Sequence, residues 1–162
     1  MEMPLLRPIT PADDPFLFEL YSQSRAEELA AFPFTLAQRQ AFLRMQFEAQ
    51  SRGFRAQFPQ AAFSLVLDGE TGLPVGRFYV DRTAAEIRLI EITLLAQRRG
   101  AGLGSRLIRG LLDEAGQRGL PVRLSVVSNN RARSLYERLG FCLVDPQPGD
   151  DGVYLAMEWK RV

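Results

Sequence analysis

The sequence predicts an α/β fold built on one mixed sheet with helices on its faces. Its 162 residues are the length of one ordinary domain, so we expect a single domain over residues 1–162. Apolar residues make up 46% and charged residues 24%, which is typical of a globular protein with a sizeable core. Segments dense in β-branched and apolar residues alternate with segments whose apolar residues recur at helical spacing, and this alternation indicates the fold class.

The first third of the chain is predicted to be mostly helical. A short edge strand at residues 4–8 comes first, and capping residues followed by proline then mark the start of a helix. Thr35 and Gln38 have the spacing of a capping box, which predicts a second helix that runs to about residue 55. An apolar loop at residues 30–34 separates the two helices.

The middle of the chain predicts a β-hairpin, a central strand and a long helix. The hairpin pairs residues 62–68 with residues 75–81 across a glycine-containing turn. Residues 86–95 are almost continuously apolar, which indicates a strand covered on both faces. The apolar residues of one helix face follow: Leu103, Leu107, Ile108, Leu111, Leu112 and Ala115.

The C-terminal segment predicts a strand, a helix and a strand pair. Residues 122–127 form the strand and residues 129–139 the helix, which Gly140 ends as a left-handed residue. Strands at residues 141–144 and 153–159 then pair on either side of a polar loop.

Charge and residue counts exclude several classes of function. Twenty basic and nineteen acidic side chains leave a net charge of +1, which argues against a nucleic-acid binder and a polybasic membrane protein. No apolar run approaches the roughly 18 residues of a membrane span, and the N-terminus lacks the basic-then-apolar order of a signal peptide. Without histidine, the chain has no Ser-His-Asp triad, Cys-His dyad or His-containing zinc site, and we expect no metal. The lone Cys142 excludes an internal disulfide, suits a reducing cytoplasm and, in its apolar strand, is expected to be a buried thiol.

A glycine-rich loop lies between the central strand and the long helix. In Arg99-Gly100-Ala101-Gly102-Leu103-Gly104, three alternate glycines let the backbone turn sharply and approach a ligand closely. The helix that follows presents unsatisfied amide groups and the positive end of its dipole, so the loop fits a phosphate. No acid occurs between Glu91 and Asp113. That interval instead contains four arginines: Arg98, Arg99, Arg106 and Arg109. A tight turn without a ligand and a solvated arginine-rich helix face are the alternatives.

Two common phosphate motifs do not fit this loop. A mononucleotide P-loop needs a lysine after its spacer, and no lysine occurs before Lys160. A dinucleotide fingerprint needs glycine or alanine at the position of Ser105 and an acid about twenty residues further on, where the chain has Leu120 and Pro121.

Two motifs resemble those of the GNAT N-acetyltransferase superfamily. Arg99–Gly104 is similar to the Gln/Arg-x-x-Gly-x-Gly/Ala signature with which that family binds the pyrophosphate of acyl-CoA. The segment Asn129-x-x-Ala132-x-x-x-Tyr136-x-x-x-Gly140-Phe141 is similar to its C-terminal cofactor helix. The resemblance implies a GNAT-like fold, with a single mixed, mostly antiparallel central sheet flanked by helices on both faces. It also implies an acetyl-CoA-binding core at residues 86–144 and acceptor-side helices at residues 1–60.

The resemblance further implies which residues bind acetyl-CoA, the co-substrate. Backbone groups of Ile92, Thr93 and Leu94 would hold the pantetheine arm. Asn129 would hydrogen-bond the pantetheine or the acyl region, a role compatible with capping its helix. The loop would surround the pyrophosphate, mainly with amide hydrogens from Arg99, Gly100, Ala101, Gly102, Leu103, Gly104 and Ser105.

Tyr136 and Glu91 are the predicted catalytic residues. The family places a tyrosine at the position of Tyr136 to give the leaving thiolate a proton or a hydrogen bond, and a core aromatic is the alternative. Relatives often carry a glutamate where this chain has Arg88 or Leu124, so no base carries over directly. Glu91 is the best local candidate, because burial in an apolar strand raises the pKa of a carboxyl group toward a useful range. A structural ion pair, a solvent-facing carboxylate, Glu86 and a water relay stay open.

The function implied is transfer of an acetyl group from acetyl-CoA to a primary amine by direct attack in a ternary complex. The amine, of a small molecule or a protein, is the expected partner, and we expect no nucleic-acid or membrane partner. Phe32-Pro33-Phe34 and the second helix would line its site, where Glu27 and Glu28 could attract a cation. A non-catalytic acyl-CoA-binding or regulatory module and a transferase of longer acyl groups are the alternatives. We expect a cytoplasmic monomer or homodimer.

Overall fold

The computed structural model describes residues 4–144 and 153–162. The polar loop expected between the last two strands, residues 145–152, therefore lies outside the described residues. The chain divides into two compact units. The first unit comprises Met1–Tyr79 and Glu91–Ala101, and the second comprises Val80–Ile90 and Gly102–Val162.

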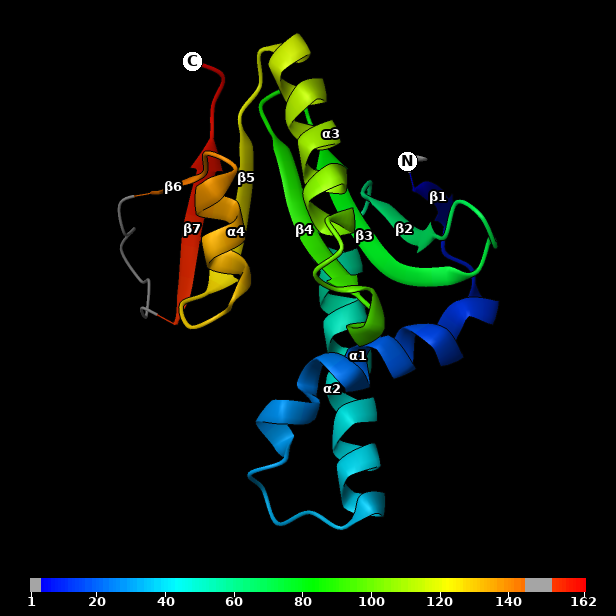
Figure 1. The fold of residues 1–162 in the computed structure, drawn as a ribbon. Helices are drawn as coiled ribbons and strands as arrows, with labels where there is room; N and C mark the ends of the chain where they lie inside the picture. Colours follow the sequence, from blue (N-terminus) through cyan, green and yellow to red (C-terminus); the bar gives the residue numbers. More distant parts are fainter. Residues whose placement is uncertain (1–3, 145–152) are drawn as a thin grey trace. The chain divides into compact units, whose positions relative to one another are not determined.

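The described strands form a seven-stranded mixed sheet. They are β1 (Leu5–Pro8), β2 (Ala62–Leu67), β3 (Pro74–Arg82), β4 (Ile87–Leu94), β5 (Val122–Val127), β6 (Cys142–Leu143) and β7 (Tyr154–Trp159). Their order in the sheet is β1-β2-β3-β4-β5-β7-β6 (Figure 1). β4 and β5 pair in parallel, whereas β1 with β2, β5 with β7 and β6 with β7 pair antiparallel. The predicted α/β class with a mixed, mostly antiparallel sheet flanked by helices is confirmed.

The first unit contains the two predicted N-terminal helices. They are α1 (Asp14–Leu29) and α2 (Leu36–Gln57), and a short 3-10 helix, Pro11–Asp13, precedes α1. The capping box at the start of α2 is confirmed, because the Gln38 amide donates to Thr35 Oγ1 at 3.1 Å and the Thr35 amide to Gln38 Oε1 at 2.9 Å. The core of this unit is a cluster of buried side chains: Leu17, Tyr21, Leu29, Leu43, Phe47 and Leu65.

The second unit contains α3 (Leu103–Arg118) and α4 (Ala132–Arg138). All six apolar residues of the predicted α3 face are buried. α4 begins later than predicted, and the side chain that accepts a backbone amide at its start is that of Asn130, from Ala132 at 2.8 Å. The predicted capping role of Asn129 is therefore wrong, whereas Gly140 has the expected positive φ of 100°. None of the described helices combines the length and apolar character that crossing a membrane requires.

Two predictions of burial are wrong. In β4 only Ile87 and Leu89 are buried, and the other side chains are half-buried, so the strand is not covered on both faces along its length. Cys142 is exposed, because it lies on β6, a two-residue strand at the edge of the sheet. An apolar run alone does not show how far a strand is covered or whether it lies at an edge of the sheet.

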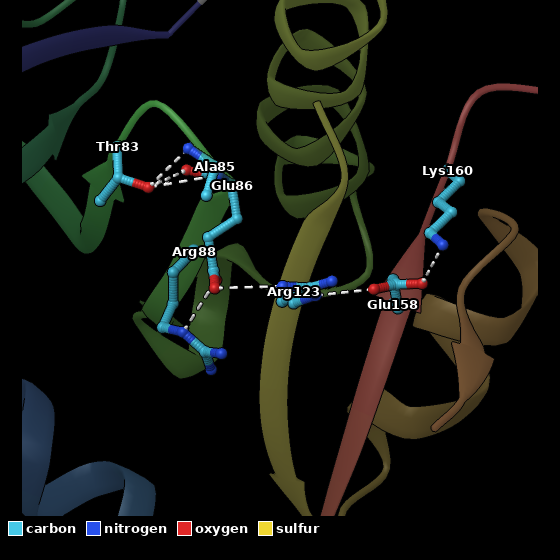
Figure 2. A network of polar contacts seen from close by, with 7 residues as sticks. All are labelled: Thr83, Ala85, Glu86, Arg88, Arg123, Glu158 and Lys160. Carbon is cyan, nitrogen blue, oxygen red and sulfur yellow. Dashed lines mark hydrogen bonds and ion pairs between the residues drawn. The ribbon is translucent and has the colours of Figure 1, made fainter. Parts of the chain in front are cut away.

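A row of charged side chains crosses the sheet in the second unit (Figure 2). The register places Arg88 opposite Arg123, and Arg123 opposite Glu158. Arg123 Nε donates to Glu158 Oε2 at 2.6 Å, and Arg123 Nη1 lies 3.4 Å from Glu86 Oε1. Arg88 Nε lies 3.2 Å from the other oxygen of Glu86. This row holds Arg88 and Glu86 in ion pairs, and the bond from Arg123 lowers the pKa of Glu158.

Candidate functional site

The glycine-rich loop has the backbone that only glycine adopts readily. Gly100 and Gly102 have φ angles of 79° and 85°, in the left-handed region. A Cβ atom built on either residue meets no other atom within 4 Å, so open space borders the backbone at both positions. A ligand can therefore approach the main chain of this loop closely.

The first turn of α3 offers amide hydrogens next to this open space. Gly102 is the residue that caps α3, and no side chain caps the helix there. The Arg106 amide donates to the Gly102 carbonyl at 3.1 Å, and the three amides before it have no acceptor within the helix. The first turn also carries no acidic side chain, so the positive end of the helix dipole is not neutralised there. These features together fit an anion such as the pyrophosphate of coenzyme A.

The arginines before the loop have different surroundings. Arg98 Nη1 lies 2.6 Å from Asp68 Oδ2 in the turn between β2 and β3. The backbone amide of Thr71, the Arg98 side chain and the amide of Glu70 all hold the pKa of Asp68 well below its usual value. Arg98 is thus engaged within the protein, whereas Arg99 is exposed and its Nε donates to the Leu94 carbonyl at 3.2 Å. Of these two arginines, Arg99 is the better placed to meet a phosphate.

The end of β4 lies close against β3, and a glycine makes this contact possible. A Cβ on Gly76 of β3 would lie 2.5 Å from the Thr93 carbonyl oxygen and 2.7 Å from Leu94 Cδ2. Gly76 therefore fixes the backbone that was predicted to hold the pantetheine arm. Gly76 is not among the predicted site residues, and its only signal in the sequence is a glycine inside a predicted strand.

The parallel ladder between β4 and β5 is short. Among the described residues, it joins only Ile87 with Val122 and Arg88 with Arg123. Ile92, Thr93 and Leu94 lie later in β4 than the residues of this ladder.

Glu91 lies in a polar cluster of the first unit. Its Oε1 accepts a hydrogen bond from Thr93 Oγ1 at 2.9 Å, and its Oε2 lies 3.5 Å from Nη2 of the buried Arg77. The side chain remains 25% exposed. The structural ion pair that the sequence left open is therefore present, in a side chain that is partly exposed. Its role as a base stays a prediction.

Tyr136 and Asn129 lie in the second unit. Tyr136 is 7% exposed and its ring packs edge-on against Phe141, with 5.7 Å between the ring centroids. This is the environment of a core aromatic, and a proton-donating role stays a prediction beside it. Asn129 is exposed and borders an open hollow of about 350 Å³. The other residues around the hollow are Ser128, Asn130, Arg131, Arg133, Ser134 and Glu137.

The structure thus distributes the predicted site residues in three places. The pyrophosphate residues, Arg99 to Ser105, run without interruption into the first turn of α3. Glu91 and the end of β4 belong to the first unit, and Asn129 and Tyr136 belong to the second. Arg77 contacts Glu91, the predicted base, and Gln50 contacts Arg77. Both residues belong to the first unit, and neither was predicted from the sequence.

Known proteins are similar to this chain in sequence over part of its length. The chain is 33% identical over 76 residues to the 5-NmdU N-acetyltransferase of Pseudomonas phage PaMx11, which covers 47% of this chain and 54% of that protein. The chain thus spans about half the length of that relative. It is 28% identical over 103 residues to an uncharacterized acetyltransferase of Streptococcus pyogenes serotype M3, which covers 64% of this chain and 71% of that protein.

A solved structure supports the fold assignment. The PaiA N-acetyltransferase from Thermoplasma acidophilum, crystallised with coenzyme A, superposes with a TM-score of 0.70 at 19% identity over 99% of this chain and 100% of that one. At this identity the similarity establishes the fold alone. Residues 19–141 match the family model of the Acetyltransferase (GNAT) family, which is more than half of the chain. The chain therefore belongs to the GNAT family of acetyltransferases.

Proposed function

We propose that this protein transfers an acetyl group from acetyl-CoA to a primary amine, by direct attack of the amine while both substrates are bound. The observation that carries the proposal is the open glycine loop joined to the uncapped start of α3. Membership of the GNAT family supports the same activity.

The chain offers backbone groups for each part of the cofactor. Amide hydrogens from Gly100 to Ser105 would bind the pyrophosphate, with Arg99 adding positive charge. The end of β4, from Ile92 to Leu94, would align the pantetheine arm. Asn129 would donate its side-chain amide to the pantetheine or the acyl region. This set fits a diphosphate ester that carries an extended amide chain.

Three groups would serve the chemistry. Acetyl-CoA supplies a thioester, whose carbonyl carbon accepts the amine nitrogen while its carbon–sulfur bond breaks. The Leu94 amide would donate a hydrogen bond to the carbonyl oxygen as negative charge develops on it. Glu91 would take a proton from the amine, and Tyr136 would give its hydroxyl proton to the departing sulfur. The proton count balances, since one proton is taken from the nitrogen and one is delivered to the thiolate.

Calorimetric titration with acetyl-CoA tests whether the glycine loop binds the pyrophosphate. The wild-type chain should bind saturably, and Gly102→Val should abolish binding, because a branched side chain would fill the space next to the loop and strain its backbone. Gly72→Val is the matched control, since Gly72 has a similar φ of 73° and similarly open surroundings, in the turn before β3. Binding by Gly102→Val at wild-type affinity would show that the loop does not bind the pyrophosphate.

A screen for acetyl transfer tests the activity. Thiol release should be measured across protein termini, lysines, polyamines, amino acids and aminoglycosides, with the products identified by mass spectrometry. Transfer to one of these classes is expected. Saturable binding of acetyl-CoA without release of thiol from any amine would instead favour a non-catalytic acyl-CoA-binding module.

A further inference from the structure

Arg77 of β3 is the one charged side chain that is buried among the residues the structure describes, with 2% of its surface exposed. Its strand neighbours from Val75 to Val80 are buried as well. Taking a guanidinium out of water is costly, and the cost is offset only where a counter-charge and hydrogen bonds compensate it. The partners of Arg77 therefore decide why an arginine occupies this position.

Those partners come from two other elements of the first unit. Arg77 Nη2 donates to Gln50 Oε1 of α2 at 3.0 Å, and the same nitrogen lies 3.5 Å from Glu91 Oε2 of β4. The guanidinium also lies over the ring of Tyr79, 5.2 Å from its centroid. Arg77 Nε is buried and has no hydrogen-bond partner within the described part of the chain. Among those residues, Glu91 is the one acid within ion-pair distance of this cation.

Glu91 is in turn held at both of its oxygens. Thr93 donates to Oε1, and Arg77 faces Oε2. A quarter of the side chain is exposed, so it is not sealed from solvent. A group that must accept a proton in a defined direction needs this combination of fixed orientation and access.

We propose that Arg77 is a positioning residue for Glu91. It orients the carboxylate, while Gln50 of α2 holds the guanidinium in place. This inference rests on the role of Glu91 as base in the proposed function.

Steady-state kinetics with the best amine test the proposal. In Arg77→Met kcat should fall about tenfold, because the carboxylate loses the contact that fixes its direction, while the KM of the amine and the affinity for acetyl-CoA stay nearly unchanged. Arg77→Lys should return most of the lost kcat, since it keeps the charge and loses the planar geometry.

Two further variants keep the test decisive. Gln50→Leu leaves the charges in place and should lower kcat by less than Arg77→Met does, so it gives an answer even if Arg77→Met does not fold. Arg82→Met is the matched control, because Arg82 lies on the same strand in an ion pair with Glu114 and should leave kcat unchanged. A kcat that stays at the wild-type value in Gln50→Leu and in every folded Arg77 variant overturns the proposal.

Glu91→Gln separates this inference from the proposed function. If it lowers kcat while the Arg77 and Gln50 variants keep the wild-type kcat, only the positioning role is wrong. If it keeps the wild-type kcat, the role of Glu91 as base fails and takes the positioning role with it.

Discussion

α3 and α2 are both long helices, but they are anchored in different ways. α3 buries a continuous stripe of six apolar side chains. α2 is longer, at 22 residues, yet buries only Leu43 and Phe47, and it leaves Leu36 at 72% and Met45 at 56% exposed. A helix that presents its first turn to a phosphate needs a fixed axis, and a complete buried stripe provides one. A helix on the proposed acceptor side can instead be held at its middle and expose apolar surface.

The largest effect expected from this comparison is on stability. Ile108→Ala, at a fully buried position of α3, should lower the free energy of unfolding by about 2 to 5 kcal/mol, because it removes apolar contacts and leaves a cavity. Leu36→Ala at the exposed start of α2 should change it by less than about 0.5 kcal/mol. Urea denaturation of both variants measures the difference. Equal losses would contradict the contrast between the two helices.

Tyr136→Phe addresses the chemistry assigned to the second unit. The variant keeps the ring that packs against Phe141 and removes the hydroxyl, so kcat should fall at least about tenfold with little change in affinity for acetyl-CoA. Steady-state kinetics combined with calorimetry measures both quantities. An unchanged kcat would leave Tyr136 as a core aromatic only.

Thr35→Ala tests how far α2 depends on its own start. The variant removes the hydroxyl that accepts the Gln38 amide and should cost about 1 kcal/mol in the free energy of unfolding. Thr35→Ser keeps a capping oxygen and serves as the control. Denaturation curves that coincide for Thr35→Ala and the wild type would mean that packing alone fixes this end of the helix.

The smallest effect concerns the pair of Arg7 and Asp13 beside α1. The hydrogen bond from Arg7 lowers the pKa of Asp13 to about 2. A lowered folded-state pKa gives stability that is present above the unfolded-state value and is lost as the pH falls through the folded-state value. The urea midpoint should therefore decline more steeply between about pH 4 and 2 in the wild type than in Asp13→Asn. Parallel declines would show that the pair contributes nothing measurable.

The elements predicted well from the sequence are those fixed by local rules. The α3 stripe, the capping box of Thr35 and Gln38 and the positive φ of Gly140 each depend on spacing within a few residues. Burial along β4 and at Cys142 depends instead on which strands lie at an edge and how far the helices reach. That information is tertiary, and an apolar run does not contain it.

The candidate site shows the same difference between features fixed by local sequence and features fixed by tertiary packing. The open glycine loop at the start of α3 could be predicted, because a strand, three glycines and a helix follow one another in the chain. The contact between Arg77 and Glu91 could not, because it depends on the pairing of neighbouring strands and on the approach of α2. The roles of Tyr136, Asn129 and Glu91 came from resemblance and local context, and they remain predictions that kinetics must test.

Gly76 has a practical consequence for protein engineering. Every other amino acid at this position would drive β3 away from the Thr93 carbonyl and so displace the end of β4. A mutational library for this protein should therefore hold position 76 constant. A variant that tolerated alanine there would be expected to carry a compensating shift in the backbone at Thr93 and Leu94.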